Sequence, residues 1–235
     1  MAGDLARLAR EFAAQIAGLL NATVCDGIRI SAVPVSPDLV LAGYGLSKQQ
    51  LQHAPFAVTV GRRTPRCWLR VGYQLCLDGE GEYLTVASSV FGVYAGAQAR
   101  QPLCRFDYER GKAGYAEAHL QVYGVSEVLR AWPPGLSGDH DIDCGEHCPF
   151  VHDGTPTREL ERLHFPAGDR RYRPILEDVI EFLIIEQLAD RRDGWKAAVA
   201  QGRETFRRHQ LRAAIRDDPE TAHQALSQLG HDRPA

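Results

Sequence analysis

Hydrophobic residues follow two different periods along this chain, a helical one near each end and an alternating one between them. In the first twenty residues, MAGDLARLAREFAAQIAGLL, apolar side chains recur three or four positions apart. The residues in this pattern are Leu5, Leu8, Phe12, Ile16 and Leu19. This spacing places them on one stripe of an amphipathic helix, which we expect to end near Asn21.

From residue 24 to 124 the pattern changes to short β-rich runs separated by proline and glycine. In RCWLRVGYQLCLD every second residue from Cys67 to Leu77 is apolar, and GEGE then turns the chain into YLTVASSVFGVYAG. A second pair of runs, QPLCRFDY and YAEAHLQVYG, is joined by ERGKAG. Alternating runs with short turns are typical of hairpins, so this region predicts a mainly antiparallel sheet.

The last part of the chain returns to helical periodicity. In PILEDVIEFLIIEQL, Pro174 suits the first position of a helix, and Glu177 and Asp178 complement its positive end. The apolar residues that follow predict a long helix near 174–190 that packs across the sheet. Beyond RRDG, two more helical patterns occur, and the second has Asp218 in position to cap it.

These patterns predict an α+β fold, with a mainly antiparallel sheet packed by the N-terminal helix and by the helix near 174–190. With 235 residues and 44% hydrophobic content, the chain is long enough for one sizeable core. We expect a main domain over residues 1–190 and a C-terminal helical extension over residues 191–235. No apolar run is long enough to cross a bilayer, so we expect no membrane association.

Charge and cysteine content bear on the cellular compartment of the protein, and they do not identify its activity. The formal net charge of −3 neither suggests nor excludes a nucleic-acid partner. The first residues lack the basic start and continuous apolar run of a secretory signal. We therefore expect a cytoplasmic protein whose six cysteines are reduced thiols.

The stretch DHDIDCGEHCPFVHD, residues 139–153, concentrates histidine, cysteine and acidic residues. Zinc prefers nitrogen and sulfur ligands in tetrahedral arrangement, and the candidate ligands are Cys144, His147, Cys148 and His152. However, the adjacent His147 and Cys148 do not easily bind one ion together, and a second ligand pair at a distance is missing. We favour an irregular surface loop with no cofactor, and keep a structural zinc as the alternative.

Alternation along two neighbouring strands separates polar side chains from apolar ones. Arg105 and Asp107 share one face of QPLCRFDY. One face of the following strand carries Tyr115, Glu117, His119, Gln121 and Tyr123. If the apolar faces are paired, these polar faces come together as well. A histidine flanked by carboxylates and arginine suits general acid/base chemistry, which makes His119, Asp107 and Glu117 candidate catalytic residues and Arg105 a candidate phosphate ligand. The alternative is the solvated side of an ordinary antiparallel sheet.

A third group of candidates lies in ERLHFPAGDRRYRP. His164 ends a strand-like run there, and Arg170, Arg171 and Arg173 precede the helix that begins near Pro174. Helix N-termini favour anions and arginines reinforce this preference, so these three residues are candidate phosphate ligands. The alternative is that they pair with the acids of RELER and LEDVIE.

The order of CRFDYER, AEAHLQVYG, LHFPAGDRRYRP and ILEDVIEFLI resembles an uncharacterised family of bacterial proteins. Over residues 100–190 or so it also resembles the TumE-type toxin proteins of toxin–antitoxin pairs. Such chains carry a clustered histidine run before the acidic helix, where this chain has His164 alone. The resemblance implies a cytoplasmic toxin-like or defence-associated protein that acts on RNA and has a small antitoxin-like protein as its partner.

Two classes of function follow. The first is an RNase that needs no metal, in which His119 or His164 transfers protons and arginines stabilise the phosphate. The second is a non-catalytic binding module that uses the sheet face and the arginine-rich loop as a docking surface, with or without zinc in the 139–153 loop. A nucleotide-binding glycine loop, a nucleophile elbow and a paired-metal signature are all missing from the sequence, which disfavours other common enzyme classes.

Overall fold

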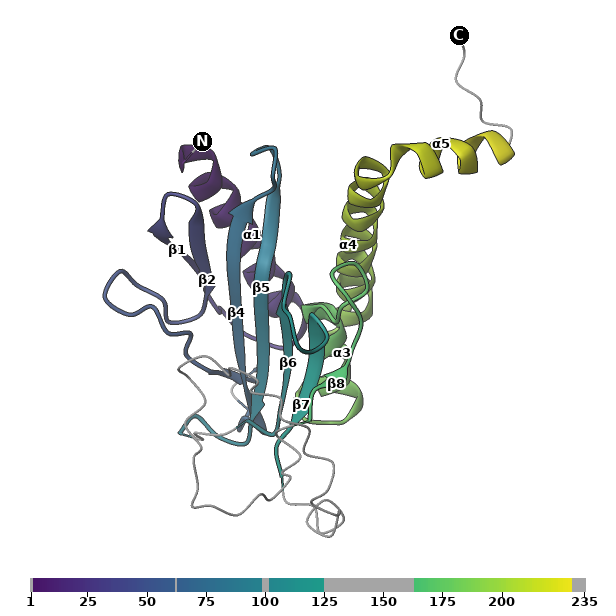
Figure 1. Cartoon of the computed structure of the whole chain (residues 1–235). Helices are drawn as coiled ribbons and strands as arrows, with labels where there is room; N and C mark the ends of the chain where they lie inside the picture. Colours follow the sequence, from purple (N-terminus) through teal and green to yellow (C-terminus); the bar gives the residue numbers. More distant parts are fainter. Residues whose placement is uncertain (1, 62, 99–101, 125–162, 230–235) are drawn as a thin grey trace, which may run out of the picture.

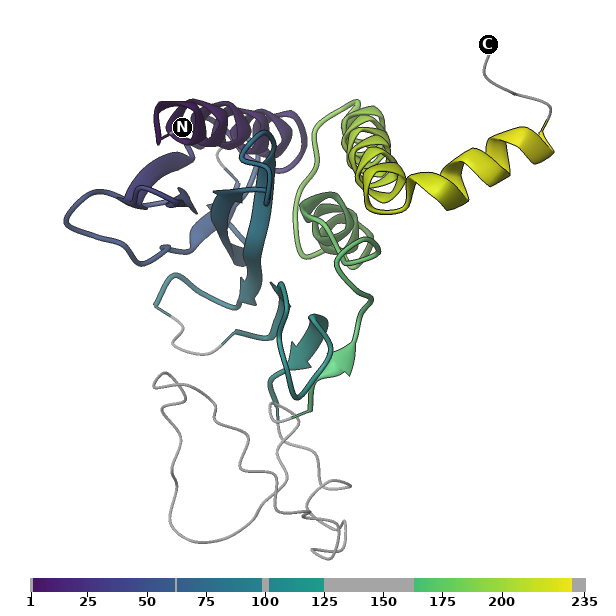
Figure 2. The same ribbon diagram turned by 45° about the horizontal axis from the view of Figure 1, so that its top comes forward.

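The computed structural model describes residues 2–61, 63–98, 102–124 and 163–229. Within these ranges the chain forms an α+β fold, in which an antiparallel sheet of eight strands carries helices on one face (Figures 1 and 2). This confirms the predicted fold class.

The sheet has the strand order β1-β2-β4-β5-β6-β7-β8, and β3 pairs with β4 outside this path. Every pairing is antiparallel. The strands are β1 (Ser31–Ser36), β2 (Leu39–Gly43), β3 (Phe56–Val58), β4 (Cys67–Leu77), β5 (Leu84–Tyr94), β6 (Cys104–Glu109), β7 (Ala118–Val122) and β8 (Phe165–Pro166).

The long hairpin of β4 and β5 forms the middle of the sheet. At its turn, the Asp78 side chain accepts hydrogen bonds from the backbone amides of Glu82 and Tyr83, at 2.8 and 3.1 Å. The predicted apolar face of β4 is confirmed, because the following residues are buried: Cys67, Leu69, Val71, Tyr73 and Leu75. They form the core against the helices.

Helix α1 (Ala2–Thr23) packs along this core as predicted, but its buried stripe is rotated from the expected one. The buried apolar positions are Leu5, Ala9, Ala13, Ile16 and Leu20. Small alanines at the centre of the stripe let the helix approach the sheet, and the larger Phe12 packs edge-on against Tyr73 with ring centroids 4.8 Å apart.

The N-terminal helix also runs two residues past the expected end at Asn21. The Asn21 side chain does not terminate it, because its amide forms two hydrogen bonds with the backbone of Ile28, at 2.8 and 2.9 Å. Asn21 therefore holds the chain that leaves the helix.

Helix α3 (Leu176–Ile185) is shorter than the helix predicted near 174–190. Ile175 rather than Pro174 stands at its N-terminal boundary, where the Asp178 carboxylate accepts the backbone N–H of Ile175 at 3.0 Å. At the other end Gln187 has a positive φ of 58°, which breaks the helical path that the apolar pattern alone would continue. Phe182 packs near Phe106 of β6, so α3 lies on the apolar face of the sheet.

Helix α4 (Trp195–Asp217) packs against α1 and α3, and α5 (Pro219–Gln228) projects away from the sheet (Figure 1). Trp195 and Val199 are buried in the core, whereas α5 has no buried residue. Asp218 caps α5 as predicted, accepting the Thr221 amide at 3.0 Å. Among the helices of the described ranges, none is long and apolar enough to cross a membrane.

Candidate functional site

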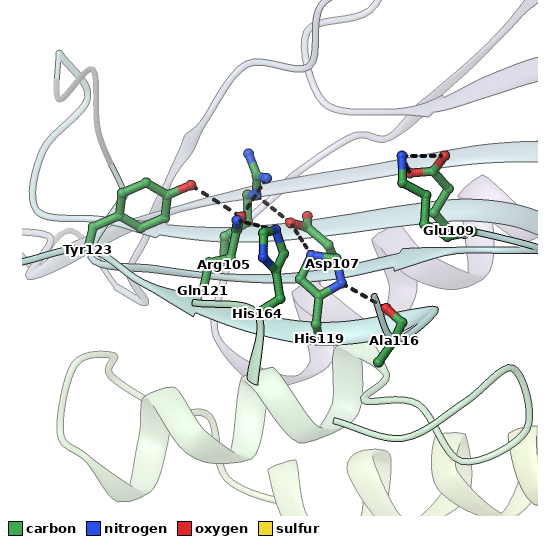
Figure 3. Close-up of polar contacts among 9 residues, drawn as sticks. Arg105, Asp107, Glu109, Ala116, His119, Gln121, Tyr123 and His164 are labelled. Carbon is green, nitrogen blue, oxygen red and sulfur yellow. Dashed lines mark hydrogen bonds and ion pairs between the residues drawn. The ribbon is translucent and has the colours of Figure 1, made fainter. Parts of the chain in front are cut away.

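The predicted polar face lies on β6, β7 and the short β8. Arg105 pairs directly with Gln121, and Asp107 with His119, so the polar side chains of the two strands share one face, as alternation predicted. His164 immediately precedes β8, the neighbour of β7, and reaches the same face. Figure 3 shows these side chains rising together from the strands on the side away from the helices.

Arg105 is held between its neighbours by two short hydrogen bonds. Its Nε donates to Oδ2 of Asp107 at 2.6 Å, and its Nη2 donates to Oε1 of Gln121 at 2.7 Å. The Tyr123 hydroxyl donates to the same glutamine oxygen at 3.4 Å (Figure 3). The Arg105 side chain keeps 37% of its surface exposed, so its charge is fixed in direction and still reachable from solvent.

His119 is almost completely buried, with 3% of its surface exposed. Its Nδ1 lies 3.1 Å from the carbonyl oxygen of Ala116, an acceptor, so Nδ1 carries the proton of the neutral ring. The other nitrogen, Nε2, lies 3.6 Å from Oδ2 of Asp107. This distance is too long for a hydrogen bond, but an imidazolium at this place would interact strongly with the carboxylate.

His164 is tied into the same network through Gln121. Because the oxygen of the Gln121 amide already accepts bonds from Arg105 and Tyr123, its NH₂ group donates to Nε2 of His164, 3.0 Å away. The rings of His119 and His164 meet edge to face with centroids 4.7 Å apart. Tyr115 stacks on His164 at 4.2 Å and contacts the edge of His119 at 4.7 Å.

Burial governs the charge of the central pair. Burial raises the pKa of Asp107 above its ordinary value of 3.8, and the opposing effect of Arg105 is smaller. Burial also lowers the pKa of His119 below 6.5, against the weaker effect of its bond to Ala116. The proton affinities of the two groups therefore approach each other, which suits proton exchange better than a fixed ion pair.

The remaining predicted acid of this face, Glu117, serves a turn rather than the histidines. Its Oε1 accepts the backbone N–H of Gly111 at 2.8 Å and lies 3.7 Å from a guanidinium nitrogen of Arg170. Arg170 is thus directed to Glu117 and not to His119.

The other two arginines of the loop point elsewhere. Arg171 forms an ion pair with Asp217 at the end of α4. Arg173 lies over the ring of Tyr108, 4.1 Å from its centroid, and over Phe206. Since Tyr108 alternates with Asp107 along β6, Arg173 stands on the opposite face of the sheet. The structure therefore brings Arg105 to the histidines and separates it from the other candidate phosphate ligands.

Two residues are more important to this arrangement than their types indicated. Alternation placed Gln121 on the polar face, but nothing in the sequence predicts that its single amide links Arg105 to His164. Alternation also placed Tyr115 on this face, but it does not predict the stacking of Tyr115 on His164.

The proposed zinc ligands Cys144, His147, Cys148 and His152 lie outside the described residues. Within the described ranges, no cluster of three or more histidine, cysteine, aspartate or glutamate residues is arranged to hold a metal ion.

Comparisons of the chain with protein-family models, with curated proteins and with solved structures each found no match. A relation to TumE-type toxins thus stays a prediction from the order of the sequence motifs.

Proposed function

We propose that the chain is an RNase-type enzyme whose active site is the polar face formed by Arg105, Asp107, His119, Gln121 and His164. One observation supports this above all: two histidines from distant parts of the chain come into ring contact beside an arginine that is oriented by two hydrogen bonds. Paired imidazoles and a fixed positive charge are the groups that phosphodiester cleavage needs.

His164 is the acid/base residue in this proposal, because it is half-buried whereas His119 is enclosed. A ribose 2′-hydroxyl displaces the Gln121 amide from Nε2 of His164, attacks the adjacent phosphorus and gives its proton to that nitrogen. The bond from phosphorus to the 5′-oxygen breaks, and the imidazolium returns the proton to that leaving oxygen. Arg105 stabilises the negative charge that develops on the phosphorus oxygens.

His119 and Asp107 act as positioning residues. His119 packs edge-on against His164. Asp107 orients Arg105 through their ion pair, and its carboxylate lies 3.6 Å from Nε2 of His119. The negative charge of Asp107 also acts on His164, so it stabilises the protonated imidazole that forms during the reaction.

Cleavage of a defined RNA by the purified chain tests the proposal. We expect His164→Ala to lower the cleavage rate by about 10²- to 10⁴-fold, because it removes the proton-transfer group. His209→Ala is the matched control, since His209 is exposed on α4 away from the site. Cleavage at equal rates by wild type, His164→Ala and His209→Ala would show that the activity belongs to a contaminant or to another site.

A second function is favoured by the near-complete burial of His119 and Gln121, at 3% and 7% exposure. Such a network can simply stabilise the sheet of a binding module, in which Arg105 contacts an anionic partner. In that case the wild type cleaves no RNA, and Arg105→Gln weakens RNA binding while His164→Ala does not.

A further inference from the structure

The polar face extends beyond the two histidines onto the central strands. Arg70 of β4 pairs with Gly92 of β5, Gly92 pairs with Arg105, and Arg105 pairs with Gln121. These residues therefore form one row across the sheet. Neighbouring strands lie about 4.8 Å apart, so the backbones of Arg70 and Arg105 are about 10 Å apart.

Because position 92 is glycine, an aromatic ring fits between the two arginines. A β-carbon at Gly92 would lie only 2.9 Å from Cε2 of Tyr94, so the tyrosine ring lies against the glycine backbone. The Arg70 guanidinium stands 5.0 Å from the centroid of the same ring. Tyr94 thus holds Arg70 in place without neutralising it.

His53 lies beside Arg70, although it comes from the loop between β2 and β3. Its ring covers Gly43 and Gly72, and a β-carbon at Gly72 would lie 2.8 Å from its Nδ1. Burial lowers the pKa of His53, and the positive charge of Arg70 acts in the same direction, against a hydrogen bond with the backbone of Ala42. The two glycines therefore leave the space in which this imidazole packs next to the guanidinium.

Both side chains present polar atoms that the fold does not satisfy. Nε2 of His53 and Nε of Arg70 are buried and have no hydrogen-bond partner in the part of the chain that the structure describes. In those same ranges Arg70 has no acidic partner, whereas Arg105, Arg170 and Arg171 each have one. Arg70 is half-buried, and a partly buried cation without an acidic partner is costly unless an anion binds there.

We propose that Arg70 binds a second phosphate of the RNA chain whose scissile phosphate lies at Arg105. The inference rests on the proposed function and names its substrate class: an oligonucleotide that crosses the sheet from β7 toward β4, rather than a mononucleotide. Arg70 supplies the charge, and the His53 ring lies beside it without a proton to donate to the phosphate.

Binding of labelled oligoribonucleotides, followed by fluorescence anisotropy, tests the inference without requiring cleavage. The probes are a dinucleotide, which has a single phosphodiester, and a hexanucleotide, both with 2′-fluoro groups so that they cannot be cleaved. The variant is Arg70→Gln. The matched control is Arg7→Gln, which removes the same charge from an ion-paired position on α1.

We expect Arg70→Gln to weaken hexanucleotide binding about tenfold, the typical effect of a lost charged hydrogen bond. The slope of log affinity against log salt should fall by about 0.7, as for one phosphate contact on a single strand. Dinucleotide binding should not change, and Arg7→Gln should bind both probes like wild type. Arg70→Lys should recover most of the affinity because it keeps the charge, and thermal melting by circular dichroism should show that each variant folds.

Other results overturn the inference. They are unchanged hexanucleotide binding in Arg70→Gln, an equal loss for both probes, no binding of either probe by wild type, or displacement of the hexanucleotide by an equal concentration of inorganic phosphate. Failure of the proposed RNase is distinguishable: a wild type that cleaves no RNA but shows Arg70-dependent hexanucleotide binding removes the catalytic proposal and keeps the second phosphate site. Conversely, cleavage of long RNA by Arg70→Gln at the wild-type rate and affinity removes the second phosphate site and keeps the catalytic proposal.

Discussion

At the scale of single residues, the buried pair of His119 and Asp107 dominates the chemistry of the polar face. Both groups are shifted toward their uncharged forms by loss of water, and each retains one polar contact that holds its orientation. A group whose folded-state pKa is lowered binds its proton less readily in the folded chain than in the unfolded chain. Its burial therefore links the stability of the fold to pH.

For His119 the sign of this linkage is definite. Its folded-state pKa lies below 6.5, so its contribution to stability is complete above pH 6.5 and is lost as the pH falls through the folded-state value. We expect wild type to lose up to about 1 kcal/mol more stability than His119→Gln between pH 7.5 and pH 5.5. Urea denaturation at both pH values measures the difference.

His53 provides the control for this prediction, because burial lowers its pKa in the same direction at a separate place. His53→Gln should leave the contribution of His119 intact, and the two variants should have additive effects on the pH dependence. An identical pH dependence in wild type and His119→Gln would contradict the assignment.

At the scale of elements, the central strands depend on glycines that admit side chains from elsewhere. Gly43 and Gly72 are paired across β2 and β4, and the His53 ring lies over both. A strand glycine normally weakens a sheet, but here the missing side chain is replaced by the imidazole of another segment. The loop from β2 to β3 is thereby attached to the face of the sheet.

Two glycine substitutions should therefore have opposite effects on stability. Gly72→Ala places a methyl group against the His53 ring and should lower the free energy of unfolding by about 1–3 kcal/mol, as overpacking does. Gly18→Ala on α1 meets no atom within 4 Å and should raise it by about 0.5–1 kcal/mol, because alanine favours the helix. Chemical denaturation of both variants at one pH makes the comparison. A stabilising effect of Gly72→Ala would show that the His53 ring does not fill the space over Gly72.

At the scale of the whole molecule, the C-terminal helices divide into a packed part and a projecting part. The first turns of α4 bury Trp195 and Val199 with α1 and α3, whereas α5 projects beyond the sheet with no buried residue (Figure 2). The stability of the fold should therefore depend on the buried residues in the first turns of α4 and very little on α5.

A truncation after Asp217 tests this division. We expect the shortened chain to melt within a few degrees of the full chain, because no residue of α5 is buried and Asp217 remains to pair with Arg171. In contrast, Trp195→Ala in the full chain should cost about 3–5 kcal/mol, as for other buried aromatic residues. Differential scanning calorimetry compares the three proteins, and a large loss of stability on truncation would show that α5 packs against the fold.

Strand periodicity explains why the sequence predicted most of this fold and the part of the site that lies on β6 and β7. A period of two places Arg105 with Asp107 and His119 with Gln121, whatever the rest of the chain does, and burying the apolar faces then sets the register of β6 and β7. The N-terminal helix and the Asp218 cap are equally local. The end of α3 could not be predicted this way, because its apolar pattern continues beyond the residue where the backbone turns.

The sequence by itself therefore determined the antiparallel sheet, its helical cover and a polar face that holds His119 beside Asp107 and Arg105. Only the tertiary structure decided that His164 joins this face, that Arg173 stands on the other one, and that His53 lies on the glycines beside Arg70. The physical reason is the range of the interactions. Alternation depends on residues next to one another along a strand, whereas these contacts depend on the path by which distant segments return to the sheet.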